Sequence, residues 1–190
     1  MKIPVLFVRQ DSVYKTLSNV DAYDIERNAK TFDGDSAVIC HPPCRSWSRL
    51  KHMANPLPGE KELAFFAVDL IRKNGGCLEH PAFSTLWQAA NLPLPGKRDS
   101  FGGWTLAFPQ FWFGHPAVKH TWFYIVGIEP QDIPDIEFKL GKAEFTICGK
   151  NEAARKWRDS TPVNLAKWLV ELVVRINLNK GKAFNESLEY

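Results

Sequence analysis

Short apolar runs of strand length, set between segments of a different character, most limit what this chain can fold into. Such runs occupy residues 3–8, 19–23, 36–40 and 121–128. The last of them, TWFYIVGI, is the clearest strand, because β-branched and aromatic residues follow one another as they do in strands buried on both faces. The runs predict a sheet whose strands are mostly parallel and lie inside the protein.

Two further segments repeat apolar residues at helical spacing. In residues 61–73 the repeated side chains are Leu63, Phe66, Ala67, Leu70 and Ile71, and Asn74-Gly75-Gly76 then ends the helix. The second helix follows Pro162, and its apolar stripe consists of Leu165, Trp168, Leu169, Leu172, Val173 and Ile176. Strands that alternate with helices in this way predict a single α/β domain over residues 1–190.

Composition narrows the class of protein without naming a function. Apolar residues make up 45% of the chain and charged residues 24%, and no apolar run reaches the length of a membrane span. The first residues lack the long apolar core of a secretory signal, so we expect a cytoplasmic protein with reduced cysteines and no membrane partner. A net charge of +3 is compatible with a nucleic-acid or phosphate ligand.

The stretch CHPPCRSWS, residues 40–48, concentrates reactive side chains directly after an apolar run. Metal binding is one interpretation: Cys40 and Cys44 could form a structural zinc site with Cys77 and His80. A zinc deaminase is a second, since Cys77-x-Glu79 and a Pro-Cys pair are pieces of its signature, although their order is reversed here. A third is that the thiol of Cys44 is a small buried core group.

The fourth interpretation makes Cys44 a nucleophile with Glu79 as its acid-base partner. Arg45 and Arg49 would supply the positive charge that lowers a thiol pKa. Both Cys44 and Glu79 follow apolar runs that we expect to be neighbouring parallel strands joined by the helix at 61–73, so their side chains should converge in one cleft at the carboxyl edge of the sheet. Trp47 is the nearest aromatic residue that could stack on a base held there.

The order of several segments resembles the cytosine-5 DNA methyltransferases. Residues 42–48, PPCRSWS, resemble the Pro-Pro-Cys-Gln-x-Phe-Ser loop of that family, and Glu79-His80-Pro81 stands where the family has Glu-Asn-Val. Residues 20–29, 121–127 and 160–163 are similar to its second strand, a late strand and the start of its last helix. The resemblance implies a three-layer, Rossmann-like methyltransferase fold.

The resemblance also implies roles for individual residues. Cys44 would attack C6 of a pyrimidine, and Glu79 would hold the ring edge and protonate N3. The residues expected to contact the substrate are Pro43, Arg45, Trp47, His80 and Lys119. The cofactor would be S-adenosylmethionine, whose ribose would be held by Asp24 at the end of the second strand, beside the first loop with Phe7.

The chain departs from the family in two places. The loop at residues 6–11, LFVRQD, has no glycine where the family has Phe-x-Gly-x-Gly. Only about thirty residues separate the strand at 121–127 from the last helix, which leaves no room for a target-recognition region. The chain therefore looks like a reduced relative of phage or prophage type that acts on a nucleotide, on single-stranded nucleic acid, or together with another subunit.

Two functions follow as expectations. The first is an enzyme that modifies a pyrimidine base, in DNA or in a nucleotide, through Cys44. The second is a non-catalytic binder that uses the same fold to occupy nucleic acid or a host protein, as a phage interference factor would. Outside the motifs, we expect His115 to be exposed in a turn, and Lys97 and Arg98 to lie in a solvated or phosphate-binding loop.

Overall fold

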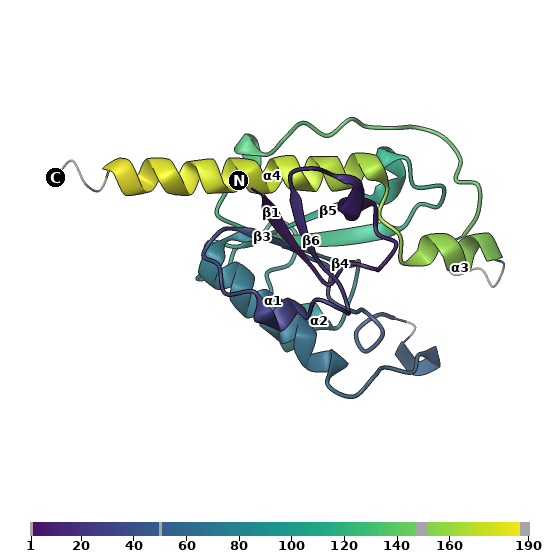
Figure 1. The fold of residues 1–190 in the computed structure, drawn as a ribbon. Coiled ribbons are helices and arrows are strands. Elements are labelled where there is room, and N and C mark those ends of the chain that lie inside the picture. The colour runs from purple at the N-terminus through teal and green to yellow at the C-terminus, as the bar shows by residue number, and fades with distance from the viewer. Residues whose placement is uncertain (1, 50, 147–151, 187–190) are drawn as a thin grey trace.

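The computed structural model describes residues 2–49, 51–146 and 152–186, which form one six-stranded sheet with helices on both faces (Figure 1). The strands are β1 (Ile3–Leu6), β2 (Val20–Tyr23), β3 (Val38–Cys40), β4 (Gly76–Pro81), β5 (Trp104–Pro109) and β6 (His120–Val126). The α-helices are α1 (Glu60–Asn74), α2 (Leu86–Ala89), α3 (Glu152–Arg158) and α4 (Val163–Glu186). Short 3-10 helices are η1 (Val13–Thr16), η2 (Ala29–Thr31), η3 (Lys51–Met53), η4 (Gln110–Phe113) and η5 (Pro130–Asp132).

The sheet is mixed, with the strand order β2-β1-β3-β4-β6-β5. The first four strands in this order are parallel to one another, but β6 runs antiparallel to both β4 and β5. The α/β class is therefore as predicted, whereas the mostly parallel sheet is only partly so. The run at 121–128 was expected to be parallel because it is apolar throughout, yet burial on both faces does not distinguish a parallel strand from a reversed one.

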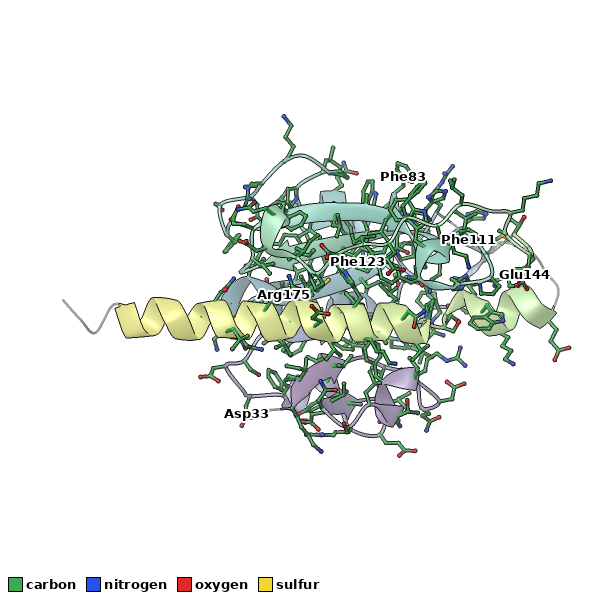
Figure 2. The ribbon with its side chains drawn as sticks, turned by 90° about the horizontal axis from the view of Figure 1, so that it is seen from above. Asp33, Phe83, Phe111, Phe123, Glu144 and Arg175 are labelled. Atoms are coloured by element: carbon green, nitrogen blue, oxygen red, sulfur yellow. The ribbon has the colours of Figure 1, made fainter. Side chains whose placement is uncertain are left out.

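Two apolar cores fill the space on either side of the sheet. On one face α4 packs through a stripe that includes Leu165, Leu169 and Ile176. On the other face α1 and α2 pack against the sheet. Figure 2 looks down on α4, with Arg175 on the helix and Phe123 beside it in the sheet. In the described part of the chain, no helix is both long and apolar enough to cross a membrane.

The passage from α1 into β4 sets the position of Glu79-His80-Pro81 on the sheet. The helix ends at Asn74, and Gly75 follows it with φ of 72°, as the glycines predict. The apolar residues 77–78 predict a short strand that ends at Glu79-His80-Pro81, and β4 runs as far as Pro81 because antiparallel pairing with β6 continues to that residue, opposite Thr121. Glu79 is therefore held inside a strand, directly opposite Phe123.

Candidate functional site

A cavity of about 610 Å³ lies at the carboxyl ends of β1, β3 and β4, and both Cys44 and Glu79 line it. These two residues are 35 positions apart in the sequence. They meet because β3 and β4 are neighbouring parallel strands joined by α1, as the sequence led us to expect. The cavity has the size of a small-molecule site.

The place of the cavity in the topology also favours ligand binding. From β1 the chain passes to β2 on one side, and β3 lies on the other side of β1. Connections that diverge in this way leave a crevice at the carboxyl ends of the two central strands, and ligands of open α/β sheets bind in such crevices.

Glu79 is held by hydrogen bonds to both of its carboxylate oxygens. Its Oε2 lies 2.9 Å from Nδ1 of His41, and its Oε1 accepts a hydrogen bond of 2.9 Å from Nε2 of Gln110. Burial favours the neutral acid, but the charge of Lys119 and the hydrogen bond from His41 outweigh it and lower the pKa of Glu79 to about 2. The side chain is therefore an ionised acceptor at the wall of the cavity.

Cys44 is a partly buried thiol whose surroundings do not activate it. Burial, followed by the charges of Asp159 and Glu79, raises the pKa of Cys44 to about 11, while Lys119 opposes the shift. The expectation that Arg45 and Arg49 would lower this pKa is wrong. The guanidinium Nε of Arg45 donates to Glu60 at 2.8 Å, and Arg49 is exposed. The sulfur is thus protonated at neutral pH in this state of the cavity.

Four of the five residues expected to contact substrate line the cavity: Pro43, Arg45, His80 and Lys119. Trp47 does not. Its side chain is buried, only 3% exposed, and its ring packs edge-on against Phe65, so the structure places it in the core instead of beside a base. The loop after Cys44 turns back into the domain there, which the sequence did not indicate.

His80 faces the opposite side of β4 from Glu79. Its Nδ1 lies 2.8 Å from the hydroxyl of Ser84. Burial lowers the pKa of His80 to about 4, against the opposing charge of Glu79, so the imidazole is neutral at neutral pH. With its side chain 1% exposed and bonded to Ser84, His80 supplies no positive charge to a ligand in the cavity.

One wall of the cavity comes from residues 156–161, which form the end of α3 and the first part of the loop before α4. Two side chains attach this wall to the body: Nε2 of His115 lies 3.0 Å from the carbonyl of Trp157, and Nζ of Lys119 donates to the carbonyl of Ser160 at 2.7 Å. His115 is thus buried, contrary to the exposed turn that we expected, because the wall packs over it. Sequence reasoning missed this role, since the contact joins segments about forty residues apart.

The residues expected to bind S-adenosylmethionine do not fit that role as a set. Phe7 lines the cavity, in a backbone conformation with φ of 64° that favours glycine. Asp24 does not line it. Its Oδ1 accepts from the backbone N–H groups of Glu26 and Arg27, and its Oδ2 pairs with Lys15. A carboxylate already bonded in this way is not available to a ribose diol.

The remaining interpretations of the motif find little support. Cys40 and Cys77 are fully buried in the two cores. Among the described residues, no three His, Cys, Asp or Glu side chains are grouped so as to hold a metal ion, and Cys148 lies outside them. Arg98 pairs with Glu129, away from the cavity lining. Neither the zinc interpretations nor phosphate binding by this loop gains an observation.

Comparison with protein-family models, with curated proteins and with solved structures gives no match to this chain. The site is therefore interpreted from its own geometry.

The charges around Cys44 make a first prediction. Because the negative charge of Glu79 raises the thiol pKa and Lys119 lowers it, Glu79→Gln should speed alkylation of Cys44 by iodoacetamide at pH 8, and Lys119→Met should slow it. At a pH well below the thiol pKa, the rate follows the thiolate fraction, so a shift of one pKa unit corresponds to about tenfold. Mass spectrometry of the modified peptide measures both rates. Equal rates in the two variants would show that these charges do not reach the sulfur.

Proposed function

We propose that the chain is an enzyme of the cytosine-5 methyltransferase type, which modifies a pyrimidine base in DNA or in a nucleotide through a covalent bond from Cys44. The observation that carries the proposal is that Cys44 and an ionised Glu79 line one cavity. A thiol that adds to C6 of a pyrimidine must lose its proton, and N3 must gain one. In this proposal Glu79, which lines the same cavity, accepts the first proton and delivers the second.

The chemistry of the addition needs only the base and these two side chains. The sulfur of Cys44 bonds to C6, the electron pair of the C5=C6 bond moves toward C4 and N3, and N3 takes the proton relayed by Glu79. C5 then becomes an electron-rich carbon that attacks an electrophile. In the absence of any other electrophile it takes a proton from water. Loss of the original C5 proton, departure of Cys44 from C6 and return of the N3 proton through Glu79 to the sulfur then restore the base and the thiol.

The finer description of the fold belongs to this proposal. A Rossmann-like methyltransferase fold is supported by the parallel strands β2-β1-β3-β4, by helices on both faces, and by a cavity at the carboxyl ends of the strands. Nucleic acid as the partner is supported by an excess of cations over anions in the cavity lining: Arg9, Arg45, Lys119, Lys156 and Arg158 against Asp11, Glu79 and Asp159.

The experiment measures exchange of the C5 hydrogen, which requires no methyl donor. The protein is incubated in D₂O with a cytosine-containing single-stranded oligonucleotide or with dCMP, and mass spectrometry follows deuterium at C5. We expect exchange with the natural chain and none with Cys44→Ala, whereas Cys77→Ala, which removes a buried thiol outside the cavity, should retain it. Exchange that persists in Cys44→Ala, or that is absent from every pyrimidine substrate, would contradict the proposal.

A non-catalytic binder is the second candidate, and specific observations favour it. The thiol of Cys44 is protonated, and Asp24 is bonded within the protein. Phe7 and Asp24 do not fit S-adenosylmethionine as a set, and the C5 exchange reaction does not depend on this compound. The C5 exchange assay separates the two candidates, and titration with S-adenosylmethionine tests the donor, since a ligand at about 100 times its Kd stabilises a protein by about 2.7 kcal/mol. If the protein shows neither stabilisation by S-adenosylmethionine nor C5 exchange, the non-catalytic binder is the candidate that remains.

A further inference from the structure

A chain of hydrogen-bonding groups runs from the interior to Glu79, and neither the motifs nor the resemblance assigns it a role. His41 stands in the middle of this chain. Its Nδ1 lies 2.9 Å from Oε2 of Glu79, and its Nε2 lies 3.0 Å from the hydroxyl of Tyr14. The three residues come from η1, the loop after β3, and β4.

The partners on either side determine where the proton of His41 sits. Glu79 is ionised and can only accept a hydrogen bond, so Nδ1 of His41 carries the proton and donates a hydrogen bond to Oε2. Tyr14 is fully buried, and burial together with the charge of Glu79 raises its pKa well above the ordinary value, so it keeps its O–H. That O–H donates to Nε2 of His41. One tautomer of the ring is thus selected from both sides.

Burial prevents the chain from rearranging. The side chains of His41 and Glu79 are only 11% and 12% exposed. Tyr14 is 1% exposed and its ring packs against the imidazole at 5.2 Å between centroids. His41 occupies one carboxylate oxygen of Glu79, and Gln110 occupies the other. With both oxygens bonded on the protein side, the plane of the carboxylate is set.

We propose that His41 is a positioning residue for Glu79, and that Tyr14 fixes His41 in turn. The pair keeps the carboxylate ionised and directed at the cavity, so that the proton from Cys44 reaches N3 by way of the oxygen lone pairs on the cavity side. The reactive part of this inference rests on the proposed function. The effect on the ionisation of Glu79 does not, and can be measured without any reaction.

Other charged and titratable groups also affect the pKa of Glu79, and its titration curve must be interpreted with them. Lys119 and His80 favour its ionised form, as His41 does. The groups that feel the charge of Glu79 in return are Tyr14, Cys44, Cys77, His80 and His115. Of these titratable groups within the described residues, His41 is the one whose side chain is hydrogen-bonded directly to the carboxylate of Glu79. Its removal should therefore raise the pKa of Glu79 even though the charge of Lys119 remains.

The test follows the carboxyl carbon of Glu79 by NMR as a function of pH in His41→Leu, His41→Gln and Tyr14→Phe. We expect the pKa of Glu79 to rise by about one unit in His41→Leu, since a donor to the charged form is lost. It should return toward the natural value in His41→Gln, whose amide can still donate, and rise less in Tyr14→Phe. His52→Leu, at an exposed histidine, and Tyr23→Phe, outside the cavity lining, are matched controls that should leave the titration unchanged.

The same variants are compared in the C5 exchange assay. His41→Leu should slow exchange by about 10- to 100-fold, as loss of a supporting hydrogen bond does in other sites, and the acid limb of its pH profile should move upward with the pKa of Glu79. An unchanged titration of Glu79 in both His41→Leu and Tyr14→Phe would overturn the inference. Absence of exchange in the natural chain would instead remove the proposed function, and the carboxyl titration would still decide the role of His41.

Discussion

Glu79→Gln is expected to lower the rate of C5 exchange by about 10²- to 10⁴-fold, which is the usual contribution of a positioned acid-base group. Glutamine can still accept a hydrogen bond from His41, and Gln110 can turn its amide so that its Oε1, which has no partner among the described residues, accepts from the new amide. The shape of the site is thereby retained while the carrier of the proton is lost.

The sign of a second effect separates this role from a loss of folding. The same substitution should speed alkylation of Cys44, since it removes a negative charge that raises the thiol pKa. Misfolding would abolish cooperative melting. Faster alkylation of Cys44 together with slower C5 exchange, in a variant that still melts cooperatively, therefore cannot be a result of misfolding. Glu129→Gln, at an exposed carboxylate paired with Arg98, is the control and should change neither rate. Natural exchange rates in Glu79→Gln would mean that another group moves the proton.

Gly76→Ala is expected to destabilise the fold by more than about 4 kcal/mol, in the range reserved for severe steric conflicts. A Cβ at this position would lie 2.0 Å from the carbonyl oxygen of Val38 and 2.8 Å from its backbone nitrogen. Both atoms belong to β3, so no flexible side chain can move aside. The φ of 130° at Gly76 adds backbone strain for any other residue. The conflict falls where β3 and β4 pair, and this pairing brings Cys44 and Glu79 to one cavity.

Urea unfolding followed by circular dichroism measures the effect, and insoluble expression would be its extreme form. Gly181→Ala is the matched control, because nothing lies within 4 Å of a Cβ built in that exposed turn of α4. Alanine is the better helix former, so this change should stabilise the protein by about 0.5–1 kcal/mol. If Gly76→Ala unfolded at the same urea concentration as the natural chain, β3 and β4 could not be packed as closely as the distances from Gly76 to Val38 require.

The local elements were largely predictable because each depends on neighbours in the sequence. The periodicity of residues 61–73 and the glycines after it account for α1 and its end. The apolar runs account for β1, β2, β3 and β6, whereas β5 was missed, since WTLAFP is short and lies next to a glycine-rich loop. The direction of β6 was also missed, because a strand apolar on both faces has the same pattern either way.

The candidate site was predictable only in part. Cys44 and Glu79 could be paired from sequence because one general rule, the right-handed crossover between parallel strands, takes both to the same edge of the sheet. Trp47 could not be assigned correctly, because an aromatic residue after a loop has the same pattern whether it enters the core or faces a ligand. Tyr14 and Gln110 carry no local signal, and their roles appear only where η1 and η4 lie against Glu79.

By itself, then, the sequence determined the α/β class, the order of most elements, and the edge of the sheet at which Cys44 and Glu79 meet, because these depend on local pattern and chain connectivity. The tertiary structure decided the protonation of the site. Burial and the charge of Asp159 raise the pKa of Cys44, whereas Lys119 and His41 lower the pKa of Glu79 against the effect of burial. Burial and the distances between charges depend on how distant segments pack, and neither is encoded at any single position.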